Sequence, residues 1–532
     1  MIDLRLTLLC WGLMAAPFAA DARPPLSASD WLSGSVDTPS NRSAWRPGDP
    51  ARPQTRPNRS DLAKSGAVEP VGVTRLGQEN PDAKGTVSAR TAGLPPDLWG
   101  NSDGATLAGI VRAQNPQLPA MRRLLRRVLA AQLAPPNVLR PEDGGALYLA
   151  RVDKLLDLGA TGAAQELLLT AGPNDPERFR RLFDIALLSG DEARACDIMN
   201  QTPGVAPSFA ARVFCLAMGG DWPAAAVVFT GAETLGRLDP ETATLMAHFL
   251  DDSFTDSRQT LDAPATVTPL TFRLHAAIGQ PLATGSLPLA FTLSDLDMNS
   301  GWKAQLDAAE RLARVGAIPA SHLREIYILQ KPAASGGVWD RTAAVQKLVE
   351  GLALRDKVMV EAALPVAFDA MNSAGLGYAL ADIAGAESAA MELPGRAGVI
   401  AMWLALAANQ SHIVEILPED ASEFDRWLVA FASGKTTGKL PANDPQGMAA
   451  VLAPVFQGKA AADLSPSAAG LIAAGQQGEA LLRAISDVDA GLSGDMVRAA
   501  TGLRILRTLG QEPIARQAAV ELMLSPEISG IR

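Results

Sequence analysis

The sequence predicts an all-α protein, and three observations support this fold class. A short glycine-centred turn returns about every 30 residues between positions 146 and 236. It occurs as Leu158-Gly159-Ala160, Ser189-Gly190-Asp191-Glu192-Ala193 and Gly219-Gly220-Asp221-Trp222. An amphipathic run precedes each turn and an Ala-rich run follows it, so the repeating unit is a helical hairpin. Hydrophobic residues make up 48% of the chain and aromatic residues only 5%, which suits close helix packing and disfavours a β-sandwich or barrel. Hairpins at this period stack into an α-solenoid.

Residues 1–22 have the pattern of a cleavable signal peptide. Arg5 precedes the apolar run at residues 6–16, and Ala20-Asp21-Ala22 places small residues at the two positions that a signal peptidase reads. We expect cleavage after Ala22 and export to the periplasm. The alternative is a retained membrane anchor, but a spanning helix needs about 20 apolar residues and this run is shorter.

Residues 23–93 are expected to form a disordered tether. Beyond Asp37 they are rich in Pro, Arg, Ser, Asn and Gly without apolar periodicity, so they bury too little surface to offset the entropy lost on ordering. The part at residues 42–64 is basic. Its charge fits either a contact with an anionic surface, such as cell-wall polymer or lipid headgroups, or a solvated spacer.

One short apolar island, Asp30-Trp31-Leu32, interrupts this tether. An apolar pair on a long polar segment is typical of a docking motif, with Trp31 and Leu32 as anchors for a groove. Three interpretations stay open: a groove on a partner, a groove on the protein's own repeats, and a segment without a role.

Helical structure is expected from residue 94 to the C-terminus in two blocks. Residues 94–261 form the N-terminal repeats and residues 262–532 the C-terminal repeats, divided at Asp262 because regularity is lost between residues 251 and 301. In the first block, a predicted helix at residues 120–133 carries four arginines beside an apolar stripe: Arg122, Arg123, Arg126 and Arg127. Such a helix lies on a membrane surface or is a repeat helix with a solvated basic face.

Signal cleavage leaves two cysteines, Cys196 and Cys215, on consecutive predicted helices. In an oxidising compartment, two thiols on facing helices can form a disulfide, which would stabilise a loop of this size by about 3 kcal/mol. The alternative is a pair of free thiols that act as small buried apolar groups.

The most distinctive loop of the second block contains Ser335, Gly336, Gly337, Trp339, Asp340 and Arg341. Paired glycines permit close backbone approach and an aromatic side chain can contact a ligand, as in functional loops. A glycine C-cap followed by Asp340 as the N-cap of a helix at residues 342–354 explains the same residues structurally.

The sequence predicts no cofactor and no metal site. The four histidines, His248, His275, His322 and His412, are widely separated and lack the spacing of metal ligands. The net charge of −10 and the pI of about 5.1 oppose nucleic-acid binding, which needs a basic surface. Because no set of polar residues in the sequence indicates a reaction site, we expect a protein that is not an enzyme.

The nearest catalytic pattern is Glu387-Ser388, which resembles the glutamate-serine pair of soluble lytic transglycosylases. In those periplasmic enzymes, which also contain a helical superhelix, a glutamic acid protonates a glycosidic oxygen. The resemblance implies that Glu387 would be the acid of a peptidoglycan-cleaving enzyme. The Gly-Leu-Met-Gln stretch expected downstream is missing, and Ala397-Gly398-Val399-Ile400 stands there instead, which puts the catalytic fold in doubt.

Several strings resemble those of a group of uncharacterised exported proteins from alphaproteobacteria. They are Asp30-Trp31-Leu32, Leu98-Trp99-Gly100, Phe214-Cys215, Gly220-Asp221-Trp222 and residues 334–341. The resemblance implies export and relatedness along the chain, and no activity. Some members carry an automated "antifreeze" label, but this sequence has no Ala-Ala-Thr array or regular Thr spacing that would support ice binding.

The predicted hairpins are also similar to tetratricopeptide-like arrays, which present an extended concave surface to a peptide or protein. We therefore expect a non-catalytic periplasmic binding or scaffolding protein with an envelope protein or peptide as partner. We expect no integral membrane span after signal cleavage. A glycan enzyme with Glu387 as acid and a purely structural envelope or secretion accessory are the alternatives.

Overall fold

The computed structural model describes residues 31–34, 80–140, 143–202, 204–251, 260–296, 300–333, 335–435, 439–444, 447–459 and 463–528. The predicted signal peptide, Asp30 and the basic part of the predicted tether lie outside the described residues. Within the described residues the protein is all-α, as predicted. Its two strands, β1 (Val87–Ser88) and β2 (Ala131–Gln132), are two residues long and pair in parallel.

The glycine-centred turns join helices into three consecutive hairpins. These are α5 (Ala146–Asp157) with α6 (Thr161–Ala171), α7 (Pro176–Ser189) with α8 (Glu192–Gln201), and α9 (Phe209–Met218) with α10 (Trp222–Thr234). The turns contain Gly159, Gly190 and Gly220, with φ of 68°, 75° and 83°. A side chain with a Cβ atom disfavours this left-handed region, which explains why glycine returns at each turn.

After residues 31–34, described structure resumes at Asn80, earlier than the expected start of the helical repeats at residue 94. It opens with η1 (Pro81–Ala83), β1 and α2 (Ala89–Ala92), followed by α3 (Gly104–Ala113) and α4 (Pro119–Ala130). Apolar periodicity did not indicate this segment because polar groups fix it. The fully buried carboxylate of Asp82 accepts hydrogen bonds from the backbone N–H groups of Gly145 and Tyr148 at 3.0 and 2.7 Å. The buried Arg151 side chain donates to the Lys84 carbonyl.

The rest of the described chain is a succession of helices that spans the second predicted block. They are α11 (Pro240–Leu250), α12 (Pro269–Ala277), η4 (Leu289–Leu296), α13 (Trp302–Arg314), α14 (Ala320–Ile328), α15 (Val338–Leu354), α16 (Lys357–Asn372), α17 (Gly377–Ala389), α18 (Gly395–Ala407), η5 (Ser411–Ile413), α19 (Glu423–Ala432), α20 (Met448–Leu452), η7 (Ala453–Phe456), α21 (Pro466–Ala473), α22 (Gln477–Asp489), η8 (Ala490–Ser493), α23 (Met496–Thr508) and α24 (Glu512–Ile528). None of the described helices combines the length and the apolar character that crossing a membrane requires.

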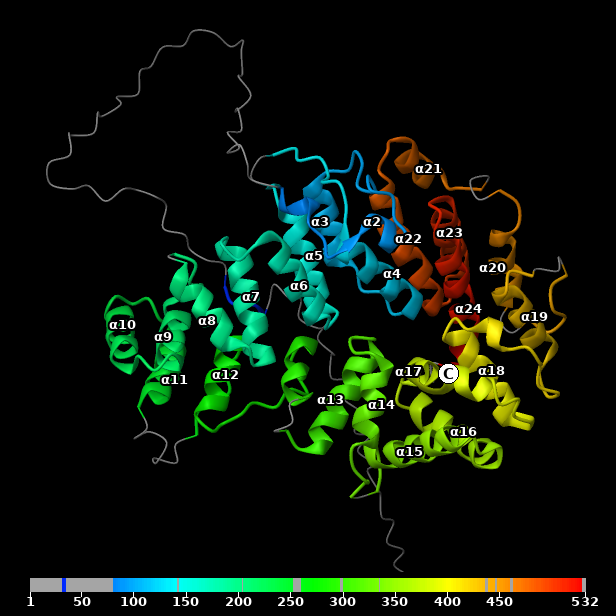
Figure 1. Cartoon of the computed structure of the whole chain (residues 1–532). Helices are drawn as coiled ribbons and strands as arrows, with labels where there is room; N and C mark the ends of the chain where they lie inside the picture. The colour runs from blue at the N-terminus through cyan, green and yellow to red at the C-terminus, as the bar shows by residue number, and fades with distance from the viewer. Residues whose placement is uncertain are drawn as a thin grey trace, which may run out of the picture.

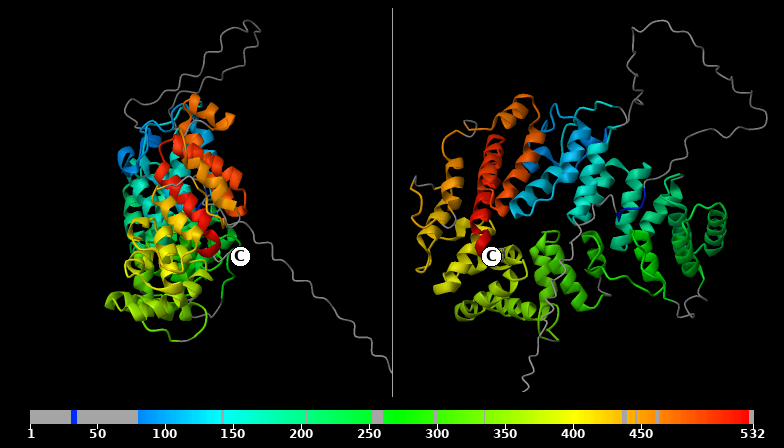
Figure 2. Two further views of the ribbon diagram at one scale, coloured as in Figure 1. Left: turned by 90° about the vertical axis from the view of Figure 1, so that its right-hand side faces the viewer. Right: turned by 180° about the vertical axis from the view of Figure 1, so that it is seen from behind.

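The chain closes on itself. It runs from α3 out to α10, returns through α12 to α19, and ends with α22 and α24 packed against α3 and α4 (Figure 1). Seen from the side, the helices form a flat body (Figure 2). Two hydrophobic cores lie within it. The main core extends over most of the helices from α3 to α24, and a smaller arm core joins α7 to α12 around Phe183, Phe214 and Met246.

Helix α4 lies at the point of closure, and its basic face is largely used by the protein itself. Arg122 donates to the Arg314 carbonyl at 2.8 Å, and Arg126 donates to the carbonyls of Val315 and Leu158 at 2.8 and 3.2 Å. These carbonyls belong to the C-terminal ends of α13 and α5, where helices lack internal partners. The expected solvated or membrane-bound basic face is therefore wrong for these two side chains.

Candidate functional site

A short peptide segment, residues 31–34, is docked against the helical body. Trp31 is only 1% exposed and Leu32 5%. The Trp31 ring meets the Phe291 ring of η4 edge to face, with centroids 5.4 Å apart, and Phe291 meets Phe272 of α12 in the same way. Trp31 therefore packs against η4 next to α12, and both Trp31 and Leu32 are buried in the main core. Edge-to-face aromatic contacts of this kind stabilise beyond the area that they bury.

Polar groups on α7 bind the backbone of the same segment. Asp184 accepts two hydrogen bonds from Ser33, one from its backbone N–H at 3.0 Å and one from its hydroxyl at 2.6 Å. Arg180 donates to the Ser33 carbonyl. Burial raises the pKa of Asp184 to about 6, against the opposing effect of Ser33, Arg180 and Arg181. We call the site formed by Arg180, Asp184, Phe272 and Phe291 the Trp31 groove.

This placement corresponds to one of the three interpretations of the apolar island, a groove on the protein's own helices. The residues that line the Trp31 groove were not identified from the sequence. A usable signal existed for Asp184, since it is a single carboxylate within the apolar run Leu182-Phe183-Asp184-Ile185-Ala186. A carboxylate at such a position needs a buried partner. No pattern identified that partner as Ser33, which lies 151 residues earlier.

Beside the docked segment lies a cavity of about 750 Å³. Ser33 and Gly34 form part of its wall, and α9, α11 and α12 contribute further residues to it, including Thr242 and Thr271. His275 also lines it, is buried, and has no hydrogen-bond partner for Nδ1 among the described residues. Burial lowers the pKa of His275 below its ordinary value, against the opposing effect of Glu241. The size of this cavity is within the range of ligand pockets.

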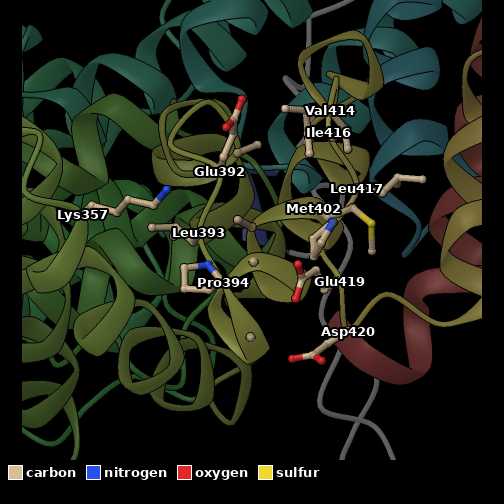
Figure 3. A pocket seen from close by; sticks show the side chains of 15 residues that line it. Lys357, Glu392, Leu393, Pro394, Met402, Val414, Ile416, Leu417, Glu419 and Asp420 are labelled. Carbon is tan, nitrogen blue, oxygen red and sulfur yellow. The ribbon is translucent and has the colours of Figure 1, made fainter.

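Smaller cavities lie elsewhere among the described helices. One of about 310 Å³ is bordered by Lys357 on one side and by Glu419 and Asp420 on the other, over an apolar floor that includes Met402 (Figure 3). A second, of about 370 Å³, lies between α4, α13 and α17 and is lined by Arg122 and Arg126 among others. The guanidinium groups of these two arginines are already bonded to the backbone carbonyls described above.

Cys196 and Cys215 are joined by a disulfide that links α8 to α9. Both cysteines are buried in the arm core. The bond closes the loop between two hairpins and gives no accessible thiol.

The distinctive glycine loop starts α15 and serves the fold. Helix α15 begins at Val338, so the expected N-cap role of Asp340 is wrong; its carboxylate instead accepts from the Gly336 N–H at 3.0 Å. Gly336 and Gly337 both have positive φ, and Ser335 is exposed. Trp339 packs on Trp302 with centroids 5.3 Å apart, and Arg341 pairs with the buried Glu310. These contacts account for the loop without a ligand.

Glu387 and Ser388 have different environments on α17. The Glu387 side chain is exposed, 3.8 Å from Arg324, whereas Ser388 is fully buried, with no hydrogen-bond partner for its hydroxyl among the described residues. Neither residue lines one of the three cavities above. The structure does not bring this pair together at a concave surface.

In the described parts of the chain no three or more His, Cys, Asp or Glu side chains are grouped so that they could hold a metal ion. Comparison of the chain with protein-family models, with curated proteins and with solved structures gives no match. The function is therefore inferred from the geometry of the Trp31 groove and its surroundings.

Proposed function

We propose that the protein is a non-catalytic periplasmic binding or scaffolding protein, a tetratricopeptide-like α-solenoid that presents its helical surface to a protein or peptide of the cell envelope. The observation that carries this proposal is the Trp31 groove, in which the helical body holds a short peptide segment by its side chains and its backbone. The three stacked hairpins and their glycine turns support the solenoid part of the proposal. The signal-peptide pattern at residues 1–22 supports the compartment.

The test is in-cell crosslinking from the periplasm with the unmodified protein, followed by identification of captured proteins. The comparison is a version lacking residues 23–36 and a full-length Trp31→Ala/Leu32→Ala variant, which changes only the two anchors. A discrete partner captured by any of the three supports the proposal. No enriched envelope protein in any sample contradicts it, and glycan binding and hydrolysis, with Glu387→Gln as control, become the next assays.

Export to the periplasm and cleavage of the signal peptide can be tested separately. The purified mature protein should begin at Arg23, as read by intact mass, and should fractionate with periplasmic markers. An unprocessed N-terminus in the membrane fraction would contradict cleavage and would favour the retained anchor.

A further inference from the structure

We propose that the Trp31 groove is a peptide-recognition site for segments with the chemistry Trp-Leu-Ser, and that residues 31–34 occupy it as a covalently attached competitor. The ligand class is a partner protein's peptide with an aromatic residue, an aliphatic residue and a hydroxyl-bearing residue in succession. This inference rests on the proposed function and deepens it, since it names the site and the chemistry of the partner.

The contacts in the groove are those of a bound peptide. Three consecutive residues supply them: Trp31 and Leu32 are buried in an apolar pocket, and Ser33 is bound through its N–H, its carbonyl and its hydroxyl. Peptide-recognition sites combine backbone hydrogen bonds for affinity with side-chain pockets for specificity. The next described residue after Gly34 is Asn80, so 45 residues separate this segment from the rest of the described fold.

The groove is also costly to leave empty. Asp184 is fully buried, and among the described residues Ser33 alone is shown to donate hydrogen bonds to its carboxylate. A buried carboxylate that loses its partners is strongly destabilised. Arg180 donates to the Ser33 carbonyl and pairs with Glu177, and Arg181 pairs with Asp153, so among the described residues neither donates to the Asp184 carboxylate. The groove is therefore built for an occupant that donates two hydrogen bonds.

The occupied site is open at one end. Ser33 and Gly34 form a wall of the 750 Å³ cavity, so a longer peptide has room to continue past the serine position over α11 and α12. Thr242, Thr244 and Thr271 line the cavity there. The hydroxyls of Thr244 and Thr271 already donate to the carbonyls of Pro240 and Thr268, so toward a peptide backbone they can only accept hydrogen bonds.

A partner peptide is a better occupant than the same segment of a second copy. An attached competitor acts at an effective concentration on the order of mM, so each copy fills its own groove and exchange between copies gains no contact. A partner that presents a longer or tighter segment can displace the attached one. Capture is thereby limited to partners that bind better than residues 31–34.

The experiment uses the full chain with Trp31→Ala/Leu32→Ala, which removes the two apolar anchors of the attached segment, and a labelled decapeptide with the sequence of residues 27–36. Fluorescence anisotropy should show saturable binding to the variant, at least about tenfold tighter than to the unmodified chain, because the attached competitor has lost both anchors. Peptides with alanine in place of the tryptophan or of the serine that follows Leu32 should bind at least about tenfold more weakly, and Asp184→Ala added to the variant should abolish binding. Sedimentation of the unmodified chain measures exchange between copies, and a stable dimer would overturn the choice of occupant.

The inference fails if the folded variant binds no peptide, or binds the alanine peptides equally well. If the variant does not fold, hydrogen exchange on the unmodified chain decides: excess peptide should speed exchange of the Leu32 to Gly34 amides, and unchanged exchange overturns the proposal. These outcomes are separable from those of the proposed function. Peptide binding without a captured envelope partner refutes the cellular role alone, and a captured partner without peptide binding refutes the groove alone.

Discussion

The main core and the arm core are built from the same kind of helical hairpin but are held in different ways. The main core is closed by contacts between residues several hundred positions apart, such as Arg123 with Glu521 and the Gln114 side chain with the Leu482 carbonyl. The arm core is held by neighbours in sequence, through an aromatic series from Phe179 to Phe249 and a disulfide over 19 residues. One repeat pattern can therefore give both a body that depends on its two ends meeting and an arm that is locally self-sufficient.

The largest effect is expected where the main core closes. Glu521 of α24 is fully buried and accepts hydrogen bonds from the Ala120 N–H at 2.7 Å and from Arg123. Glu521→Ala should lower the free energy of unfolding by about 3–5 kcal/mol, because it leaves the buried Ala120 N–H without a partner and opens a cavity at the junction of α4 and α24. Urea denaturation followed by circular dichroism measures it. Glu527→Ala, on the exposed side of the same helix, is the matched control; equal values for the two variants would mean that closure contributes little.

Removal of the Cys196–Cys215 disulfide tests whether the arm core is stabilised locally. Cys196→Ser/Cys215→Ser should lower the free energy of unfolding by about 3 kcal/mol on the chain-entropy estimate. The loss of stability should be confined to the arm core. Hydrogen exchange should become faster in α8 and α9 while α22 to α24 keep their protection. Equal acceleration in both cores would show that arm and body unfold as one unit, and the two cores would then not differ in how they are held.

The same difference explains what the sequence could and could not predict. Hairpin turns and helix ends depend on neighbouring residues, so they leave a local pattern. Helix α19 (Glu423–Ala432) is an example, since a capping box between Ser422 and Asp425, 3 residues apart, fixes its start. The closure of the main core, where α22 and α24 pack against α3 and α4, leaves no such local pattern. Arg122 and Arg126 were interpreted as a solvated basic face because their partners are backbone carbonyls of Arg314 and Val315, which have no sequence signature.

The residues of the Trp31 groove also differ in whether the sequence could predict their role. Trp31 and Leu32 stood out as an apolar island and therefore as a docking motif. Phe291 did not, because η4 lies in the stretch where helical regularity is lost, and its ring acquires a role only when residues far apart in the chain meet. The glycine loop shows the opposite case, a distinctive local pattern with a structural role. Its sequence suggested that Trp339 and Arg341 contact a ligand, but these side chains pack on Trp302 and Glu310.

The junction between the two cores should respond to pH. The pKa of Asp184 is raised to about 6 by burial, so the folded protein binds this proton more tightly than the unfolded chain. The stabilisation is fully present below about pH 4 and is lost as pH rises through 6, a change on the order of 3 kcal/mol at most. Unfolding free energies at pH 4 to 7 should therefore fall less steeply for Asp184→Asn than for the unmodified chain. Parallel pH profiles would show that Ser33 and Arg180 already compensate the charge.

The smallest effect is expected on the outer face of the arm. On α10, Ala225 is 0% exposed and packs in the arm core, while its neighbour Ala226 is exposed beside Val227 at 73%. Ala226→Lys should change the free energy of unfolding by less than about 0.5 kcal/mol. Ala225→Lys, the same change one position earlier, should disrupt the packing of α10 on α9, because a lysine there buries an unpaired charge. If Ala226→Lys instead lowered stability or changed the sedimentation coefficient, the apolar face of α10 would be covered in solution. The arm would then owe its stability to a second molecule, whereas the main core owes its own to closure within one chain.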